Sequence, residues 1–509
     1  MAVAADSSTG SGAMPNWVML ERFVFRRDDP KCFREDKRTS ATGETSVGVR
    51  FSVSFILAEP PTPSRLYLSW PEGPKRERMC HLVAAHRNLV LLRLDSFVDP
   101  RNTSPFGEVV HDYLIYIADP FAQAQSTPVL RRVPSYTKYN AHYERPRTFP
   151  FESPGVGLFC SGGEFAVAYL NICLGDDTSS EEEELDSPLT LEATLWVLRS
   201  IVSDDSAGGG EKWEVKSLPI HLSRDDEYKP LPSWKTNEVV PFKDGLCWVD
   251  YNSGILHCEG ICGDNPKVSF IKFPRNIRRH SALRSELYRS LCVTGGGQTL
   301  VFLDVGRHDG AALGPMAPGS GFTITYMTLT DRGAGTNDFT IEAGELWSTH
   351  TTEDLPREIM MLPLLSMDDP NVAHFVLYDW ADKVGKFSLV TIDLSTKRVV
   401  GSVVPYINGE EDLYTDDADM VKAKPYFFMH FLPTEFPTFL NLHRSQEEEE
   451  HCVRHFHCIG NRSNHYCRKR KNSAFVAFTA LAISSLSFNS AGFSDGLFQF
   501  KMDKIAFEV

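Results

Sequence analysis

The densest group of metal-ligating side chains in the sequence lies in the stretch HCVRHFHCIGNRSNHYCRKRK, residues 451–471. Thiolate and imidazole groups suit zinc, and a structural zinc site takes four of them. The candidate ligands are Cys452, His455, Cys458, His465 and Cys467. Their spacing fits no zinc-finger or zinc-knuckle pattern, and they are more numerous than a tetrahedral site needs. Zinc in this tail is therefore the alternative, and we prefer an unstructured segment with adventitious metal affinity and no cofactor.

Four basic residues follow this cluster: Arg468, Lys469, Arg470 and Lys471. They could serve as a nuclear localisation patch. They could also flank a membrane segment, because residues 472–494 carry no charge and have about the length that spans a bilayer. The serines of this segment, with Asn489 and Gly492, offset most of its apolar character. We prefer a weakly ordered or docked tail to a C-terminal anchor, so a membrane partner is not expected.

Elsewhere the residues that could do chemistry are better explained by local structure. His257, Cys258 and Cys262 have the spacing of half a zinc site, but the sequence offers no second pair nearby. The run TGGGQ at 294–298 lacks the lysine of a phosphate-binding loop and predicts a hairpin turn. The stretches VDYNSG (249–254) and DVGRHDG (304–310) contain acid–base side chains, and we interpret both as turns in which aspartates cap the backbone.

These candidates would have to be positioned by strands. From Trp17 onward the chain consists of short apolar runs, many alternating at period two, separated by Gly, Pro, Asn and Asp. Similar strand–turn–strand stretches begin at Leu246 and Leu291, and TLWVLRS with Leu195 precedes them. A repeat of roughly 40–50 residues with several strands is typical of propeller blades. We therefore predict an all-β, β-propeller-like fold with blades of short antiparallel strands, and the alternative is a stacked β-sandwich.

Composition narrows the function classes. The chain has 509 residues, a formal net charge of −15 and eleven cysteines. An acidic chain is a poor general nucleic-acid binder, so no nucleic-acid partner is expected. Cysteines scattered singly indicate reduced thiols, which predicts a cytoplasmic or nuclear location. The N-terminal residues lack the basic and apolar regions of a secretory signal.

Three longer stretches of the sequence are LPSWKTNEVVPFKDGLCWVDYNSGILHC (231–258), TGGGQTLVFLDVGRH (294–308) and LPLLSMDDPNVAHFVLYD (362–379). They resemble a plant family, expanded in grasses, that is known as domain of unknown function 1618. The resemblance covers about residues 16–430, with the diagnostic domain at about 246–385. It also extends to propeller domains that follow F-boxes in plant ubiquitin-ligase adaptors, although residues 1–60 show no F-box pattern. The family implies no activity.

The resulting domain prediction has three parts: a disordered N-terminus at 1–15, a propeller-like body at 16–440 and a divergent, poorly ordered tail at 441–509. Since no catalytic motif was found, the preferred function is a non-enzymatic module that binds another protein through its loops. No catalytic residue, cofactor or small-molecule substrate is predicted. The alternative is a propeller-type enzyme, a hydrolase, with its site in a central channel.

Overall fold

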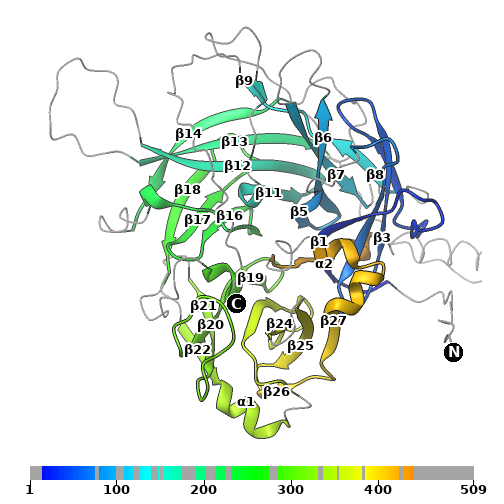
Figure 1. Ribbon diagram of the computed structural model, residues 1–509. Helices are drawn as coiled ribbons and strands as arrows, with labels where there is room; N and C mark the ends of the chain where they lie inside the picture. Colours follow the sequence, from blue (N-terminus) through cyan, green and yellow to red (C-terminus); the bar gives the residue numbers. More distant parts are fainter. Residues whose placement is uncertain are drawn as a thin grey trace, which may run out of the picture. The chain divides into compact units, whose positions relative to one another are not determined.

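The computed structural model (Figure 1) describes fifteen stretches of the chain: 14–74, 80–98, 108–118, 127–138, 147–148, 151, 153–174, 191–201, 212–223, 231–273, 284–330, 336–351, 355–380, 385–422 and 429–440. The chain divides into two compact units, Met1–Cys452 and Val453–Val509, and every described residue belongs to the first. Most of the predicted disordered N-terminus, residues 1–13, and the whole predicted tail, 441–509, lie outside the described residues.

The first unit is built almost entirely of strands, most of which fall into six groups of four or five strands within the described residues. We number these groups as blades 1 to 6. Blades 1 and 2 are joined by one residue pair, Phe23 with His81. Blades 3 and 4 are joined by two parallel pairs, which form the site described below. A separate two-stranded ladder pairs β9 (Thr137–Lys138) with β10 (Arg147–Thr148).

The first three blades contain the following strands, given in spatial order. Blade 1 contains β2 (Ala41–Glu44), β3 (Arg50–Ile56), β4 (Ser64–Ser69), β1 (Val18–Arg26) and β28 (Leu432–Thr434). Blade 2 contains β5 (His81–His86), β6 (Leu89–Val98), β7 (Glu108–Ile117) and β8 (Val129–Arg132). Blade 3 contains β11 (Val156–Ser161), β12 (Glu164–Leu174), β13 (Leu191–Ile201) and β14 (Glu214–His221).

The other three blades follow in chain order. Blade 4 contains β15 (Glu238–Phe242), β16 (Gly245–Asp250), β17 (Gly254–Glu259) and β18 (Lys267–Lys272). Blade 5 contains β19 (Arg289–Thr294), β20 (Thr299–Arg307), β21 (Phe322–Leu329) and β22 (Thr336–Glu342). Blade 6 contains β23 (Met360–Leu365), β24 (Val372–Asp379), β25 (Lys386–Asp393), β26 (Arg398–Val399) and β27 (Val404–Asn408).

Helical segments are short. The α-helices with described bounds are α1 (Ala343–Thr349) and α2 (Ala418–Lys422). The 3-10 turns are η2 (Ser153–Gly155), η4 (Leu231–Ser233), η5 (Ser285–Leu287) and η6 (Gly409–Tyr414). Among the described residues, no helix has the length and apolar character needed to cross a bilayer.

Each blade packs its two faces against the blades before and after it, since an isolated small sheet would expose both faces to water. Four clusters of buried apolar side chains lie between successive blades from 1 to 5, and a fifth, larger cluster joins blades 5, 6 and 1. Central members of these clusters are Val53 and Leu92, Leu91 and Val167, Leu195 and Trp248, Val249 and Phe302, and Val305, Phe375 and Tyr67. The blades therefore form a closed cycle, in the order that Figure 1 shows.

The cycle is closed by pairing of the first strand with the last described one. Strand β1 pairs antiparallel with β28, with Val18 opposite Thr434 and Leu20 opposite Leu432. The first strands of the later blades, β5, β11, β15, β19 and β23, contact one another in succession. The predicted all-β, propeller-like fold is confirmed, and the cyclic order of the cores favours it over two stacked sheets.

The predicted repeat is only partly right. The stretches at Leu246 and Leu291 are both strand–turn–strand units, but the first forms β16 and β17 in the middle of blade 4, whereas the second forms β19 and β20 at the start of blade 5. Leu195 lies in β13, a third strand. Local hairpin similarity was therefore mistaken for equivalence of blade position, because any antiparallel hairpin shows the same alternating pattern.

Candidate functional site

The larger of the two best-formed pockets among the described residues is a groove between blades 3 and 4. It has a volume of about 530 Å³ and is lined by residues 216–219 and 221 of β14 and by residues 264–268, which lead into β18. Strands β14 and β18 pair in parallel at Ile220 with Val268 and at His221 with Ser269. The groove lies where this ladder stops, and its walls are the edge of β14 and the turn at 264–266 that leads into β18.

Side chains hold the walls of the groove in place. Arg199, on β13, donates hydrogen bonds from Nε to the carbonyl of Ile261 at 3.0 Å and from a guanidinium nitrogen to that of Gly263 at 2.7 Å. Lys216 Nζ donates to the Asp264 carbonyl at 2.6 Å. These bonds fasten the turn before β18 to the neighbouring blade, which makes the groove a fixed feature of the fold.

A second polar cluster lies where distant blades meet. Arg22 on β1 donates from Nε to the carbonyl of His430 at 2.7 Å, and another of its guanidinium nitrogens lies 3.8 Å from Glu238 on β15. Tyr251 donates its hydroxyl to Glu238 at 2.6 Å. Blades 1 and 4 are three places apart in a cycle of six, so this contact crosses the middle of the ring.

The same junction contains a buried carboxyl. Glu21, on β1, is 3% exposed, and it accepts hydrogen bonds from the Tyr406 hydroxyl and, at 3.1 Å, from the Phe23 amide. Burial raises the pKa of the Glu21 carboxyl to about 7, although the Phe23 amide and the charge of Arg65 lower it. Glu21 is thus largely protonated below neutral pH.

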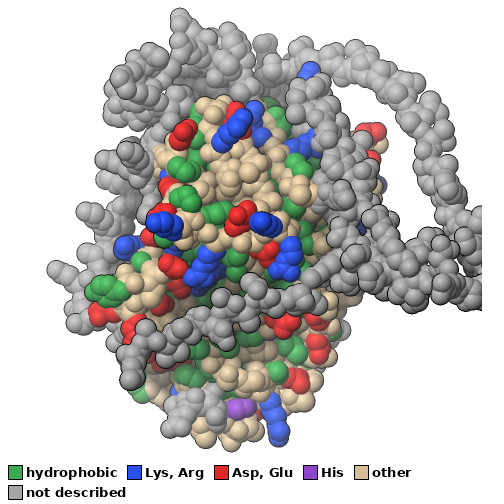
Figure 2. Space-filling view, turned by 90° about the vertical axis from the view of Figure 1, so that its right-hand side faces the viewer, with side chains coloured by type: hydrophobic (Ala, Val, Ile, Leu, Met, Phe, Trp, Pro, Cys, Tyr) green, Lys and Arg blue, Asp and Glu red, His purple; other side chains and the backbone are tan. Residues whose placement is uncertain are grey.

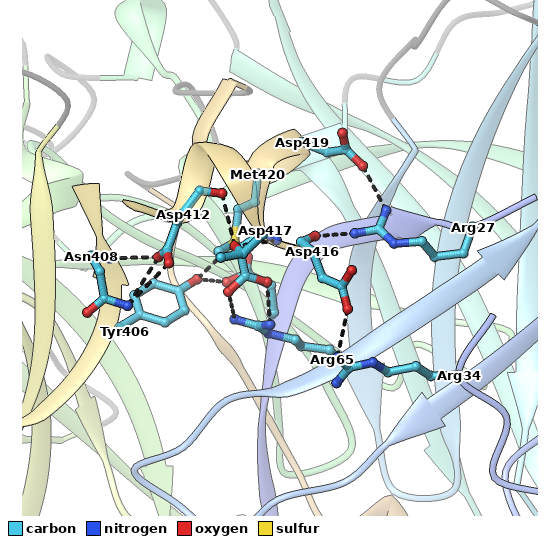
Figure 3. A network of polar contacts seen from close by, with 12 residues as sticks. Arg27, Arg34, Arg65, Tyr406, Asn408, Asp412, Asp416, Asp417, Asp419 and Met420 are labelled. Atoms are coloured by element: carbon cyan, nitrogen blue, oxygen red, sulfur yellow. Dashed lines mark hydrogen bonds and ion pairs between the residues drawn. The ribbon is translucent and has the colours of Figure 1, made fainter. Parts of the chain in front are cut away.

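Ion pairs surround this carboxyl and connect blade 1 to the segment that contains η6 and α2 (Figure 3). Arg65 on β4 binds both carboxylate oxygens of Asp417, at 2.6 and 3.2 Å. Arg27 pairs with Asp419 at 2.7 Å, and Arg34, which is more exposed, pairs with Asp416 at 2.7 Å. Because each of these three arginines has an acidic partner, the ion pairs fasten the segment with η6 and α2 to blade 1.

One serine–histidine contact has the geometry of an activated nucleophile. The Ser153 hydroxyl oxygen lies 2.5 Å from His81 Nε2. His81 is 5% exposed. The nearby pocket lined by Tyr113, Phe151 and Trp213 has a volume of about 20 Å³, enough for about one water molecule. A substrate would have to enter by a route other than this pocket.

The predicted metal and localisation residues of the tail, Cys452 to Lys471, and the apolar segment 472–494 lie outside the described residues. Within the part of the chain that is described, no group of three or more His, Cys, Asp or Glu side chains is arranged to hold a metal ion.

The half zinc site considered at His257 and Cys258 does not form. Both lie in β17, where successive side chains point to opposite faces. Cys258 packs in the core between blades 3 and 4, whereas His257 lies 5.2 Å, ring to ring, from Phe242. Burial raises the pKa of the Cys258 thiol to about 12, so the thiol is protonated at neutral pH.

The turns predicted at 294–298 and 249–254 are confirmed. Gly295, Gly296 and Gly297 form the turn between β19 and β20 with φ of 60°, 65° and 91°, which explains the glycine run. Asp250 accepts hydrogen bonds from the Asn252 amide at 2.9 Å and the Ser253 hydroxyl at 3.0 Å, which is turn chemistry.

The grouping of 304–310 into a single loop was wrong. Asp304 and Arg307 lie in β20, where Asp304 pairs with Arg289 at 2.8 Å. Only the end of the stretch turns: Asp309 binds Arg307 at 2.8 Å and accepts the Ala311 amide at 3.1 Å.

Sequence reasoning missed the residues of the groove and of the central cluster. A signal was available for Glu21 and Arg22, because two charged residues interrupt an otherwise apolar strand, VMLERFVFR. Lys216 and Lys267 gave no signal, since lysines on an exposed strand are ordinary.

Comparison with known proteins identifies the domain but not an activity. Residues 248–374 match the family described as "Protein of unknown function (DUF1618)". This segment therefore belongs to the DUF1618 family. The match covers β16 to the start of β24, inside the predicted diagnostic region. No curated protein matches the sequence.

Three solved structures show weak similarity to this DUF1618 protein. A variant α-L-arabinofuranosidase from Fusarium graminearum is 12% identical, with a TM-score of 0.26, over 75% of this chain and 99% of that one. An endo-arabinase from Bacteroides thetaiotaomicron is 10% identical, with a TM-score of 0.20, over 50% and 80%. Drosophila Semaphorin 2a is 9% identical, with a TM-score of 0.17, over 74% and 61%. These scores are too low to establish a common fold.

Proposed function

We propose that this DUF1618 protein is a non-enzymatic, intracellular protein-interaction module. The observation that carries the proposal is the groove between β14 and β18, which is open to solvent and bounded on one side by the edge of β14. Peptide-binding domains use such edges, since backbone groups supply affinity and side-chain pockets supply specificity. The groove contains no paired acid and base of the kind that catalysis requires.

The rest of the described surface supports recognition by polar and backbone contacts. Figure 2 shows one face on which basic and acidic side chains are interspersed and apolar ones are scattered. The exposed large hydrophobic residues in the described part of the chain are Val47, Val215, Met367, Val400 and Tyr414. They are far apart in the sequence, and four of them lie outside the groove strands, which does not suggest a broad apolar interface.

A displayed library of linear peptides tests the proposal. The full chain, immobilised through a tag, should enrich a family of related sequences, and synthetic versions should bind it in solution. If repeated selections enrich nothing above a tag-only control, the interaction-module proposal is wrong.

A hydrolase is the second candidate, and the Ser153–His81 contact is the observation that favours it. A fluorophosphonate probe, which reacts with activated serines, distinguishes the two candidates. Labelling of Ser153 that is lost in His81→Ala would support the hydrolase; no labelling, with the Ser153→Ala variant as the baseline, would support the module.

A further inference from the structure

The groove is the opened end of a parallel ladder. If the register of Ile220 with Val268 continued toward the start of both strands, residues 216–219 would lie opposite residues 264–267. These are the segments that line the opening. Their other edges are in use, because β14 pairs with β13 and β18 pairs with β17. One strand edge, that of β14, and the turn at 264–266 therefore face a space of about 530 Å³, within the range of about 300–1,000 Å³ that ligand pockets occupy.

The chemistry of the walls indicates what would fill this space. Edge strands present backbone groups that pair readily with another extended chain. Pro219 and Pro266 line the groove and have no N–H group, so the occupant should donate hydrogen bonds as well as accept them. Prolines on an edge also limit how far pairing can extend, which favours a short segment.

The charged side chains that line the groove favour an acidic occupant. Lys267 and His221 are exposed at the groove, and Lys216 is half-buried there, whereas Asp264 is its single acidic lining residue. Lys216 already pairs with Glu214 at 3.4 Å, so an acidic side chain on the occupant would face chiefly the Lys267 ammonium and the His221 imidazole.

We propose that the β14–β18 groove binds an extended segment of a partner protein, about four residues long, that adds a strand to β14 and places a carboxylate near Lys267 and His221. This inference rests on the proposed function and names the surface and the kind of partner. It makes the join between blades 3 and 4 the recognition element of the molecule.

The experiment uses acidic peptides obtained from the library selection, labelled with a fluorophore, and the full chain. Leu218→Arg should fill the groove and weaken binding about tenfold or more. Lys267→Glu should weaken acidic peptides about fivefold or more, and should have less effect on the same peptides with Asn or Gln in place of the acid. Val400→Arg, at a residue 48% exposed in blade 6, is the matched control and should bind like the wild type. Hydrogen exchange at residues 215–218 should slow when peptide is bound.

The outcomes separate the two proposals. If selected peptides bind all three variants as tightly as the wild type, or protect other strands instead, the groove proposal is overturned while the interaction module stands. If no peptide binds the wild-type chain, both fail. Should Leu218→Arg not fold, Lys267→Glu decides the question, because Lys267 is exposed and its replacement leaves the core unchanged.

Discussion

Replacing Glu21 with glutamine should stabilise the protein above pH 7 and change its stability little near pH 4.5. The Glu21 carboxyl is buried against Tyr406 and Phe23, with the charges of Arg22 and Arg65 nearby. Its pKa in the folded state is about 7, against an ordinary value of 4.5. The folded state binds the proton of Glu21 more tightly than the unfolded state does, so the protonated carboxyl adds to the free energy of unfolding. This contribution is complete below pH 4.5 and is lost as pH rises through about 7.

The magnitude follows from the size of the shift. A rise of the pKa from 4.5 to about 7 corresponds to roughly 3.5 kcal/mol at most, since a tenfold change in proton affinity is about 1.4 kcal/mol. The discount for solvent screening is small because Glu21 is 3% exposed. Glutamine has nearly the same shape, stays neutral at every pH and can still accept the Tyr406 hydroxyl.

The assay is urea unfolding, followed by tryptophan fluorescence, between pH 5 and 8.5. The difference in unfolding free energy between Glu21→Gln and the wild type should grow by roughly 2–3 kcal/mol over this range and level off above pH 7. Glu44→Gln, whose side chain is 56% exposed, is the control and should show a nearly constant difference. A constant difference for Glu21→Gln as well would refute the reasoning that burial keeps this carboxyl protonated.

Three further predictions concern stability. In a double-mutant cycle, Arg65→Ala and Asp417→Ala should show a coupling of about 1–3 kcal/mol, because the pair is bidentate and its side chains are 21% and 19% exposed. The matched Arg34–Asp416 pair, 54% and 58% exposed, should give about 0–1 kcal/mol, and equal couplings would contradict the role of burial. Burial lowers the pKa of His374 to about 4. The neutral imidazole therefore contributes to the unfolding free energy above pH 6.5, and this contribution is lost as pH falls toward 4. In urea titrations, His374→Gln should lose up to about 3 kcal/mol less unfolding free energy than the wild type as pH falls from 6.5 to 4. An equal loss in the two proteins would argue against a buried, neutral His374. Gly245→Ala should destabilise the fold by about 2 kcal/mol or more in thermal melts, since a Cβ there meets the Cys258 carbonyl. The control is Gly344→Ala in α1, which has open space around it and should be neutral or mildly stabilising. Similar losses of stability for both variants would disprove the steric explanation.

Local features were predictable because they depend on a few neighbouring residues. The glycines at 295–297 adopt positive φ in a hairpin, and Asp250 caps its own turn. Trp248 is fully buried in a blade core, and Trp196, Trp213 and Trp347 pack against the cores with partial exposure, as expected for large aromatic residues in strand-like runs. The family resemblance also located the DUF1618 domain, at 248–374 against a predicted 246–385.

The sequence by itself determined that this protein is built of short strands with tight turns, since alternation and turn residues act over a few positions. Only the tertiary structure decided which strands are neighbours. Arg65 meets Asp417 and Arg22 meets Glu238 across hundreds of residues, because closing the cycle brings the blades that carry them together. The groove has the same origin: a parallel ladder joins two blades at Ile220 and Val268 and opens just before them, a register that no local pattern encodes.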